Sequence, residues 1–256
     1  MISSLASKVR DLKLLEESKQ LPAARELAIH IKTVTPNTIL ASSRLQNLRF
    51  YLRNNGYDDE FIKQTRIPEI TISAQKERDS AGELRDAAPM TIPAYFSLRN
   101  VSDRISQMPR EEAATIPDVC DVMVALAMRP SEVTTLHVSK DGVTGYSKGT
   151  THEPRPLASF CIEDWKQAED LLFWIRKSLA LKSSLNPASS SGAKIFKKFL
   201  NSVGIDKLST LRKIGADYTG DMLGTGTIAS KIAYMRLALR HSDASHPSSV
   251  EFYGRI

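Results

Sequence analysis

Residues 125–133 read ALAMRPSEV, and they mark the point at which one predicted helix ends and the next begins. Apolar residues at helical spacing predict a helix from about residue 111 to Met128. Arg129 follows directly, and Pro130 with Glu132 is typical of the first turn of a new helix. We therefore expect Arg129 to lie at a junction between two helices.

Downstream of this junction, the pattern predicts a small sheet and then more helices. Asp141-Gly142 is a strong hairpin signal. The predicted strands cover residues 136–139, 143–147 and 155–160, and the predicted helices cover residues 162–180, 193–203, 208–222 and 227–240, with a short one near 248–253. Residues 89–256 are therefore expected to form one mainly α domain with a small antiparallel β-sheet.

The first 88 residues are predicted to form a separate helical domain. Apolar residues recur at helical spacing on both sides of residues 35–38 (TPNT), which break one helix and offer the start of another. From about residue 64 to Ala88 the chain is charged and has few large apolar residues. We expect a linker or a loosely packed connection there, before a second domain over residues 89–256.

The composition is that of a globular protein with a basic surface. The 256 residues are 41% hydrophobic and carry a net charge of +6, and residues 192–256 hold 10 basic against 5 acidic residues. Such an excess of positive charge favours a polyanionic partner. Two cysteines exclude a disulfide scaffold. No stretch has the pattern of a membrane span or a secretion signal, so we expect an intracellular protein.

The usual signatures of cofactor and metal chemistry are absent from the sequence. There is no P-loop, no GxGxxG after a strand and no HExxH. The five histidines lack metal-ligand spacing, and the acidic residues do not cluster as in a two-metal nuclease. We therefore expect no cofactor, and either a metal-free mechanism or binding alone.

Four stretches place chemically useful side chains in a fixed order. They read ALAMRPSEV (125–133), VTGYSKGT (143–150), LSTLRKIGA (208–216), and ALRHS (238–242) followed by VEFY (250–253). The resulting order is Arg129, Lys148, Arg212, His241 and Tyr253. Over roughly residues 90–256, this arrangement resembles the catalytic domain of the tyrosine recombinase (phage integrase) family. The N-terminal helices are similar in kind to that family's DNA-gripping core-binding domain.

The resemblance implies a site-specific recombinase or integrase that cleaves and rejoins DNA through a covalent 3′-phosphotyrosyl intermediate, without metal or ATP. Tyr253 would be the nucleophile, and Arg129 and Arg212 would hold the scissile phosphate. Lys148 would protonate the departing 5′-oxygen, and His241 matches the family's late histidine. The residue types suit this chemistry independently of the resemblance. A tyrosine hydroxyl can attack phosphorus, guanidinium groups stabilise the transition-state charge, and a lysine can donate a proton.

Two positions leave alternatives, and the resemblance also implies partners. Lys140, beside the hairpin turn, competes with Lys148 as the proton donor, and His246 competes with His241. The expected partners are double-stranded DNA and further copies of the chain assembled on that DNA, with no membrane. The expected location is with the DNA, which in a eukaryote is the nucleus.

Two features depart from the family's pattern. Ser209 stands where the family has a histidine, three residues before Arg212, and serine is a poor proton shuttle. Tyr253 lies twelve residues after His241, which is more than the family's usual gap. A catalytically inactive DNA-binding protein of the same fold is therefore the alternative function. A helical scaffold for an acidic partner is a third reading, but it does not explain the ordered series.

Overall fold

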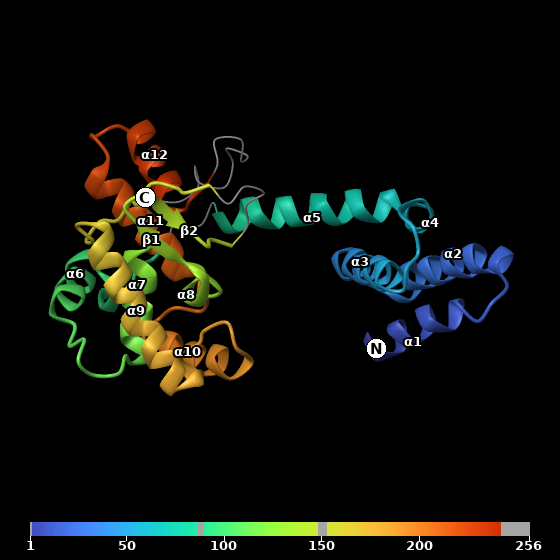
Figure 1. The fold of residues 1–256 in the computed structure, drawn as a ribbon. Coiled ribbons are helices and arrows are strands. Elements are labelled where there is room, and N and C mark those ends of the chain that lie inside the picture. The colour runs from blue at the N-terminus through green and yellow to red at the C-terminus, as the bar shows by residue number, and fades with distance from the viewer. Residues whose placement is uncertain (1, 87–89, 148–152, 242–256) are drawn as a thin grey trace. The chain divides into compact units, whose positions relative to one another are not determined.

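The computed structural model describes residues 2–86, 90–147 and 153–241. The chain divides into two compact units, Met1–Ala88 and Pro89–Ile256. The described residues form twelve α-helices and one antiparallel sheet of two strands, β1 and β2 (Figure 1). The predicted class, mainly helical with a small antiparallel sheet, is confirmed.

The first unit is built from five helices around a small apolar core. They are α1 (Ile2–Leu12), α2 (Glu17–Val34), α3 (Thr38–Asn54), α4 (Asp59–Lys63) and α5 (Pro68–Asp86). The predicted break before residue 38 is present, because the Asn37 side chain accepts a hydrogen bond of 2.9 Å from the amide of Leu40 and so caps α3. Leu45, Leu48 and Leu52 of α3 are buried in the core of this unit.

Helix α5 covers most of the stretch for which the sequence predicts a linker or loose connection. Pro68 is its first residue, where the missing amide hydrogen costs nothing. Ile70 packs against the core of the unit, and Ala74 is fully buried. The low apolar content of this stretch therefore reflects an exposed helix with a narrow buried face, since only one face contacts other residues.

The central helix of the second unit is α7 (Ile116–Ala125). All of its residues from Val119 to Ala125 are buried. The other elements are η1 (Ala94–Phe96), α6 (Leu98–Gln107), α8 (Glu132–Thr135), β1 (His137–Ser139), β2 (Gly142–Thr144), α9 (Trp165–Leu181), η2 (Ser183–Leu185), α10 (Ser190–Ser202), α11 (Ser209–Leu223) and α12 (Ile228–Ala238). Figure 1 shows α7 inside this unit, among α6, α9 and α11. The residues that follow α7, Leu126 to Met128, are buried as well, so the turn after α7 is packed in the core of the unit.

The sheet is a hairpin in which Val138 of β1 pairs with Val143 of β2. The predicted third strand over residues 155–160 is wrong, because this segment makes only a single bridge, between Arg155 and Val143. The amide of each of these residues donates to the carbonyl of the other, at 2.7 and 2.9 Å. Pro154 and Pro156 flank Arg155 and have no amide hydrogen, so the ladder cannot continue.

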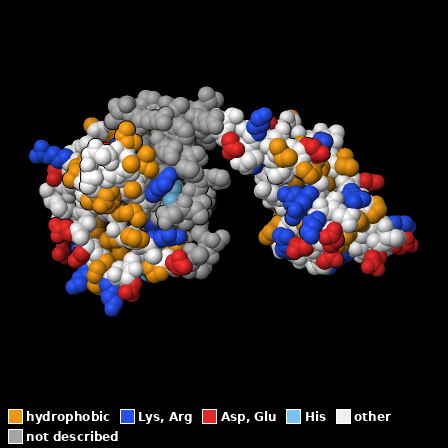
Figure 2. Space-filling view, turned by 90° about the horizontal axis from the view of Figure 1, so that it is seen from above, with side chains coloured by type: hydrophobic (Ala, Val, Ile, Leu, Met, Phe, Trp, Pro, Cys, Tyr) orange, Lys and Arg blue, Asp and Glu red, His pale blue; other side chains and the backbone are white. Residues whose placement is uncertain are grey.

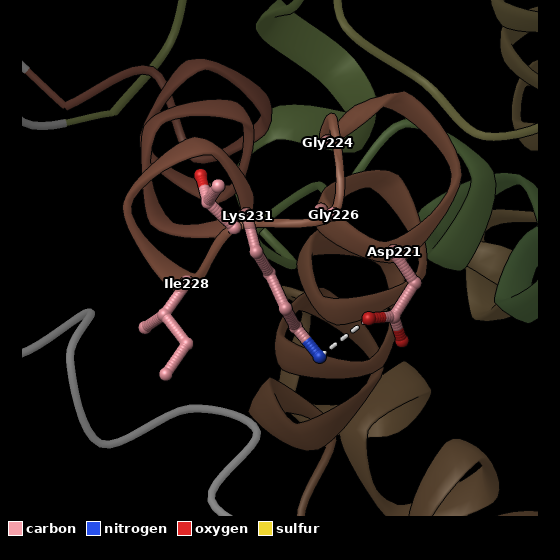
Figure 3. Close-up of a pocket in the computed structure, with 7 residues that line it drawn as sticks. Asp221, Gly224, Gly226, Ile228 and Lys231 are labelled. Carbon is pink, nitrogen blue, oxygen red and sulfur yellow. Dashed lines mark ion pairs between the residues drawn. The ribbon is translucent and has the colours of Figure 1, made fainter.

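Helix α12 is fixed to α11 near its first turn. Lys231 of α12 lies 2.8 Å from a carboxylate oxygen of Asp217 and 2.6 Å from one of Asp221, both in α11. Figure 3 shows Lys231 reaching toward Asp221, beside the connecting loop that carries Gly224 and Gly226. The two helices therefore pack as a pair, and the position of one determines that of the other.

Candidate functional site

The site is organised by one carboxylate, that of Glu132 at the start of α8. Glu132 is fully buried. Its Oε1 accepts hydrogen bonds from Arg129 Nη1 at 2.7 Å and from the amide of Ser147 at 2.9 Å. Its Oε2 accepts from the amide of Arg129 at 2.8 Å, from Arg240 Nη2 at 3.0 Å and from Arg212 Nη1 at 3.3 Å. Three segments far apart in sequence thus meet at one side chain.

The Glu132 carboxylate is ionised at neutral pH. Burial acts to raise its pKa, but the charges of Arg240 and Arg212 and the hydrogen bonds from Arg129 act in the other direction, and the pKa ends below its ordinary value. The negative charge is therefore fixed in the interior by its three arginine partners.

Arg129 connects this carboxylate to the end of the hairpin segment. Its Nη1 also donates to the carbonyl of Ser147 at 2.6 Å, and the hydroxyl groups of Ser131 and Ser147 lie 2.7 Å apart. The Arg129 side chain keeps 23% of its surface exposed. It is the most accessible of the three arginines, so it is the one best placed to meet a ligand directly.

Arg212 reaches the same place from the middle of α11. Its Nη1 donates to the carbonyl of Ala127 at 2.9 Å, and its Nη2 donates to the carbonyl of Leu239 at the end of α12. Arg212 is buried within its helix. Its guanidinium group therefore links the turn after α7 to the end of α12.

Arg240 is the third arginine, and it lies just past the end of α12. Its Nη1 donates to the carbonyl of Leu126 at 2.9 Å, and its Nη2 donates to that of Ala127 at 2.7 Å as well as to Glu132. Burial lowers the pKa of this guanidinium, against the opposing effect of Glu132. The side chain of Arg240 is only 4% exposed, so it is the least accessible of the three arginines.

His241 follows Arg240 directly and is half-buried. Its amide donates to the carbonyl of Arg236 at 3.0 Å. Burial, and then the positive charges of Arg212 and Arg129, lower the pKa of the imidazole from 6.5 to about 4. His241 is therefore neutral near pH 7, and a neutral imidazole can donate one hydrogen bond and accept another.

Of the predicted site residues, three lie in this region of the structure: Arg129, Arg212 and His241. Lys148, Tyr253 and the alternative histidine His246 lie outside the described residues. Lys140, the alternative lysine, is exposed at the turn between β1 and β2.

Ser209 and two further tyrosines of the second unit, Tyr218 and Tyr234, have distinct environments. Ser209 is exposed at the first position of α11, one turn before Arg212. Tyr218 is buried, its hydroxyl donates to the carbonyl of Phe96 at 2.8 Å, and burial raises its pKa to about 12. Tyr218 is thus a core residue. Tyr234 is partly buried in α12.

Sequence reasoning missed two members of the site, Glu132 and Arg240. Glu132 was interpreted only as a helix-start residue, although its place three residues after Arg129 puts both side chains on one side of a helical turn. Arg240 stands next to His241 and was passed over as part of the motif around that histidine. A signal for Glu132 was present, because an acidic residue in an otherwise apolar and basic stretch needs a partner if it is buried.

The chain has no match among protein-family models, curated proteins or solved structures.

Two further features bear on what the described residues can hold. They contain no helix long and apolar enough to cross a membrane. Within the same ranges, no three His, Cys, Asp or Glu side chains are grouped so as to hold a metal ion.

The candidate site carries a net positive charge. Three guanidinium groups against one carboxylate leave two positive charges beside a neutral histidine. Such a place favours an anion with several acceptor oxygens, and phosphate is the commonest of these.

Proposed function

We propose that the second unit binds a phosphate of the DNA backbone at the arginine site and cleaves and rejoins that strand through Tyr253. The observation that carries the proposal is that Arg129 and Arg212 both bond Glu132 and that their charges lower the pKa of His241, although the three residues come from separate parts of the chain. Their order along the sequence is the order that resembles the tyrosine recombinases. Geometry and sequence order are independent observations, and both favour the same chemistry.

The proposed reaction begins with attack of the Tyr253 hydroxyl oxygen on phosphorus. The hydroxyl group loses its proton to solvent as a bond forms between this oxygen and phosphorus, and the bond from phosphorus to the 5′-oxygen breaks. Lys148 gives a proton to the departing 5′-oxygen. Arg129 and Arg212 stabilise the added negative charge on the non-bridging oxygens. Attack by a 5′-hydroxyl on the phosphotyrosine reverses these steps and rejoins the strand, with no external energy source.

His241 would act in this reaction as a hydrogen-bond donor to a phosphate oxygen. Its pKa of about 4 leaves too little of the imidazolium form near pH 7 for it to begin as a proton donor. A bound phosphate brings negative charge, which raises the pKa of a neighbouring histidine. His241 would therefore gain proton affinity as the phosphate binds.

The first unit would add contacts of its own to the phosphate backbone of the duplex. Burial and the neighbouring charge of Arg66 lower the pKa of Arg49 on α3, so these two guanidinium groups repel each other. Like charges held close together are stabilised by phosphate groups of a nucleic acid. Figure 2 shows basic side chains on the visible face of each unit, with acidic ones among them on both.

The test is a covalent adduct on nicked duplexes. The chain is incubated with a pool of duplexes that have random central sequences and a nick, so that a short product strand is lost after cleavage. We expect a slow-migrating protein–DNA species on denaturing gels, without added metal. Mass spectrometry of the digested adduct should place the nucleotide on the peptide that contains Tyr253.

Two variants make this test specific. Tyr253→Phe should abolish the adduct, and Tyr234→Phe should leave it intact because Tyr234 lies in a helix of the packed unit. An adduct that persists in Tyr253→Phe would exclude this residue as the nucleophile. Arg212→Lys should bind DNA but form the adduct much more slowly, because one ammonium cannot replace a forked guanidinium.

A second candidate function is DNA binding without cleavage. Ser209 favours it, because an exposed serine one turn before Arg212 can donate a hydrogen bond but cannot shuttle a proton near neutral pH. This function predicts DNA affinity that falls steeply with salt and no adduct on any nicked substrate. Formation of the adduct by the wild type would exclude it.

A further inference from the structure

Arg240 has contacts that neither the motif order nor the proposed reaction assigns to it. It is buried, and its guanidinium nitrogens bond Glu132 and the carbonyls of Leu126 and Ala127. Its remaining nitrogen, Nε, has no hydrogen-bond partner in the described part of the chain. Buried arginines are costly unless their charge is compensated, so this placement requires a reason.

The backbone at this place is also unusual. Among the described residues other than glycine, only Ala127 and Arg240 have positive φ, at 44° and 55°. A left-handed conformation is unfavourable for a residue that carries a side chain. The two residues are joined to each other, because the carbonyl of Ala127 accepts from Arg240 Nη2 at 2.7 Å. The guanidinium group thus holds both left-handed residues in place, and one of them directly precedes His241.

We propose that Arg240 is the counter-ion of Glu132 and the positioning residue of His241, so that Glu132 does not cancel the charge that Arg129 and Arg212 present to a phosphate. This inference rests on the proposed function in taking phosphate as the ligand. The role differs from that of the other two arginines, because Arg240 acts through Glu132 and through the backbone and does not touch the ligand.

The charges at the site support this division of roles. Glu132 carries one negative charge, and Arg240 exerts the largest favourable charge effect on it. Without Arg240, the carboxylate would offset one of the two remaining guanidinium groups, and the site would keep a single net positive charge. A loss of one charge a few ångströms from a phosphate corresponds to roughly a tenfold loss of affinity in a partly screened site.

The position of His241 supports the second part of the proposal. Helix α12 is bonded to α11 near its start, through Lys231, and at its end, through Arg212 and the carbonyl of Leu239. Beyond that end, the Arg240 side chain bonds the turn after α7. His241 therefore leaves the helix in a direction that is fixed by the guanidinium of its neighbour.

The experiment uses the full chain with inorganic phosphate as the probe, and NMR of His241 as the readout. Two quantities are measured, the dissociation constant for phosphate and the pKa of His241. Arg240→Met should weaken phosphate binding by on the order of tenfold and raise the pKa of His241 above about 4, toward 6.5. Arg240→Lys keeps the charge but loses the forked contacts to the two carbonyls, so it should restore most of the phosphate affinity and leave the pKa of His241 raised. Unchanged values in Arg240→Met would overturn the proposal.

Two further variants separate charge from backbone. Glu132→Gln with Arg240→Met removes both members of the pair and should return phosphate affinity to near that of the wild type. Arg240→Gly relieves the left-handed strain at φ 55° but removes the charge, so it should still bind phosphate weakly. If Arg240→Met fails to fold, the double variant decides, because recovery of a folded, phosphate-binding chain supports the pairing and continued failure contradicts it.

A matched control comes from another arginine of the same unit. Arg104 pairs with the buried Asp121 between α6 and α7, so Arg104→Met should lower stability and leave the pKa of His241 unchanged. The outcomes also separate this inference from the proposed function. If the wild type binds no phosphate, the proposed function loses its support, while the pKa of His241 in the Arg240 variants still tests the positioning role.

Discussion

Gly215 of α11 lies so close to α7 that a Cβ atom added to it would stand 1.9 Å from the carbonyl oxygen of Val124. That carbonyl belongs to the backbone of a buried helix and cannot move aside. Arg212 is one turn earlier on α11, so the same close approach carries its guanidinium group to Ala127 and Glu132.

Gly215→Ala is therefore expected to lower the free energy of unfolding by about 2–3 kcal/mol, as in other overpacked cores. It should also weaken phosphate binding, because α11 must move away from α7 and Arg212 moves with it. Urea denaturation and phosphate titration measure the two effects. Asn201→Ala, on an exposed face of α10, is the control and should change neither. A wild-type stability in Gly215→Ala would contradict the close packing.

The ion pair between Arg104 and Asp121 is expected to hold α6 on α7. Arg104 Nε and Nη2 donate to the two carboxylate oxygens of Asp121 at 2.6 and 2.8 Å, and Asp121 is fully buried. Asp121→Ala leaves the guanidinium without its partner and should destabilise the chain by about 3 kcal/mol, measured by chemical denaturation. Asp103→Ala breaks an exposed pair with Arg99 and should cost less than about 0.5 kcal/mol.

Lys231 is expected to stabilise the packing of α12 on α11. Lys231→Met would leave the buried Asp217 beside Asp221 with no positive charge between them. The expected loss is about 2–3 kcal/mol. As a control, Lys63→Met removes an exposed pair with Glu60 and should shift the unfolding midpoint little. Equal effects of the two substitutions would show that the contacts of Lys231 with α11 add nothing to stability.

Stability should depend on pH through His241. Its pKa is 6.5 in the unfolded chain and about 4 in the folded one, so the unfolded chain binds more protons between these values. The titration of His241 therefore leaves the free energy of unfolding unchanged above pH 6.5. It lowers that free energy progressively as the pH falls from 6.5 toward 4. His241→Gln should flatten the pH profile of the unfolding free energy in this window. An unchanged profile in His241→Gln would contradict the burial of a neutral imidazole.

The sequence predicts the elements of this chain better than it predicts their lengths. Helical spacing and the cap at Asn37 were sufficient for α3, since both signals are local. The strand expected over residues 155–160 does not form, because the prolines on either side of Arg155 have no amide hydrogen to continue a ladder. The helix expected from residue 111 begins only after Thr115, whose side chain and that of Asp118 cap α7 reciprocally.

The sequence predicts some residues of the candidate site but not the contacts that join them. Arg129, Arg212 and His241 could be proposed because their order along the chain is visible in the sequence. Glu132 and Arg240 could not be assigned in this way, because their roles depend on burial and on contacts across about 80 to 110 positions of sequence separation. Such contacts are set by the packing of α7, α11 and α12, which no local pattern reveals.

The short sheet has a consequence for how copies of this chain meet. Arg155 directs its amide and carbonyl toward Val143, so the neighbouring positions 154 and 156 face away from the hairpin, and both are prolines. The outer rim of the sheet therefore offers no amide hydrogen at either position. A foreign strand finds carbonyl acceptors but no amide donors at these two positions, which disfavours extension of the ladder and edge-to-edge aggregation there.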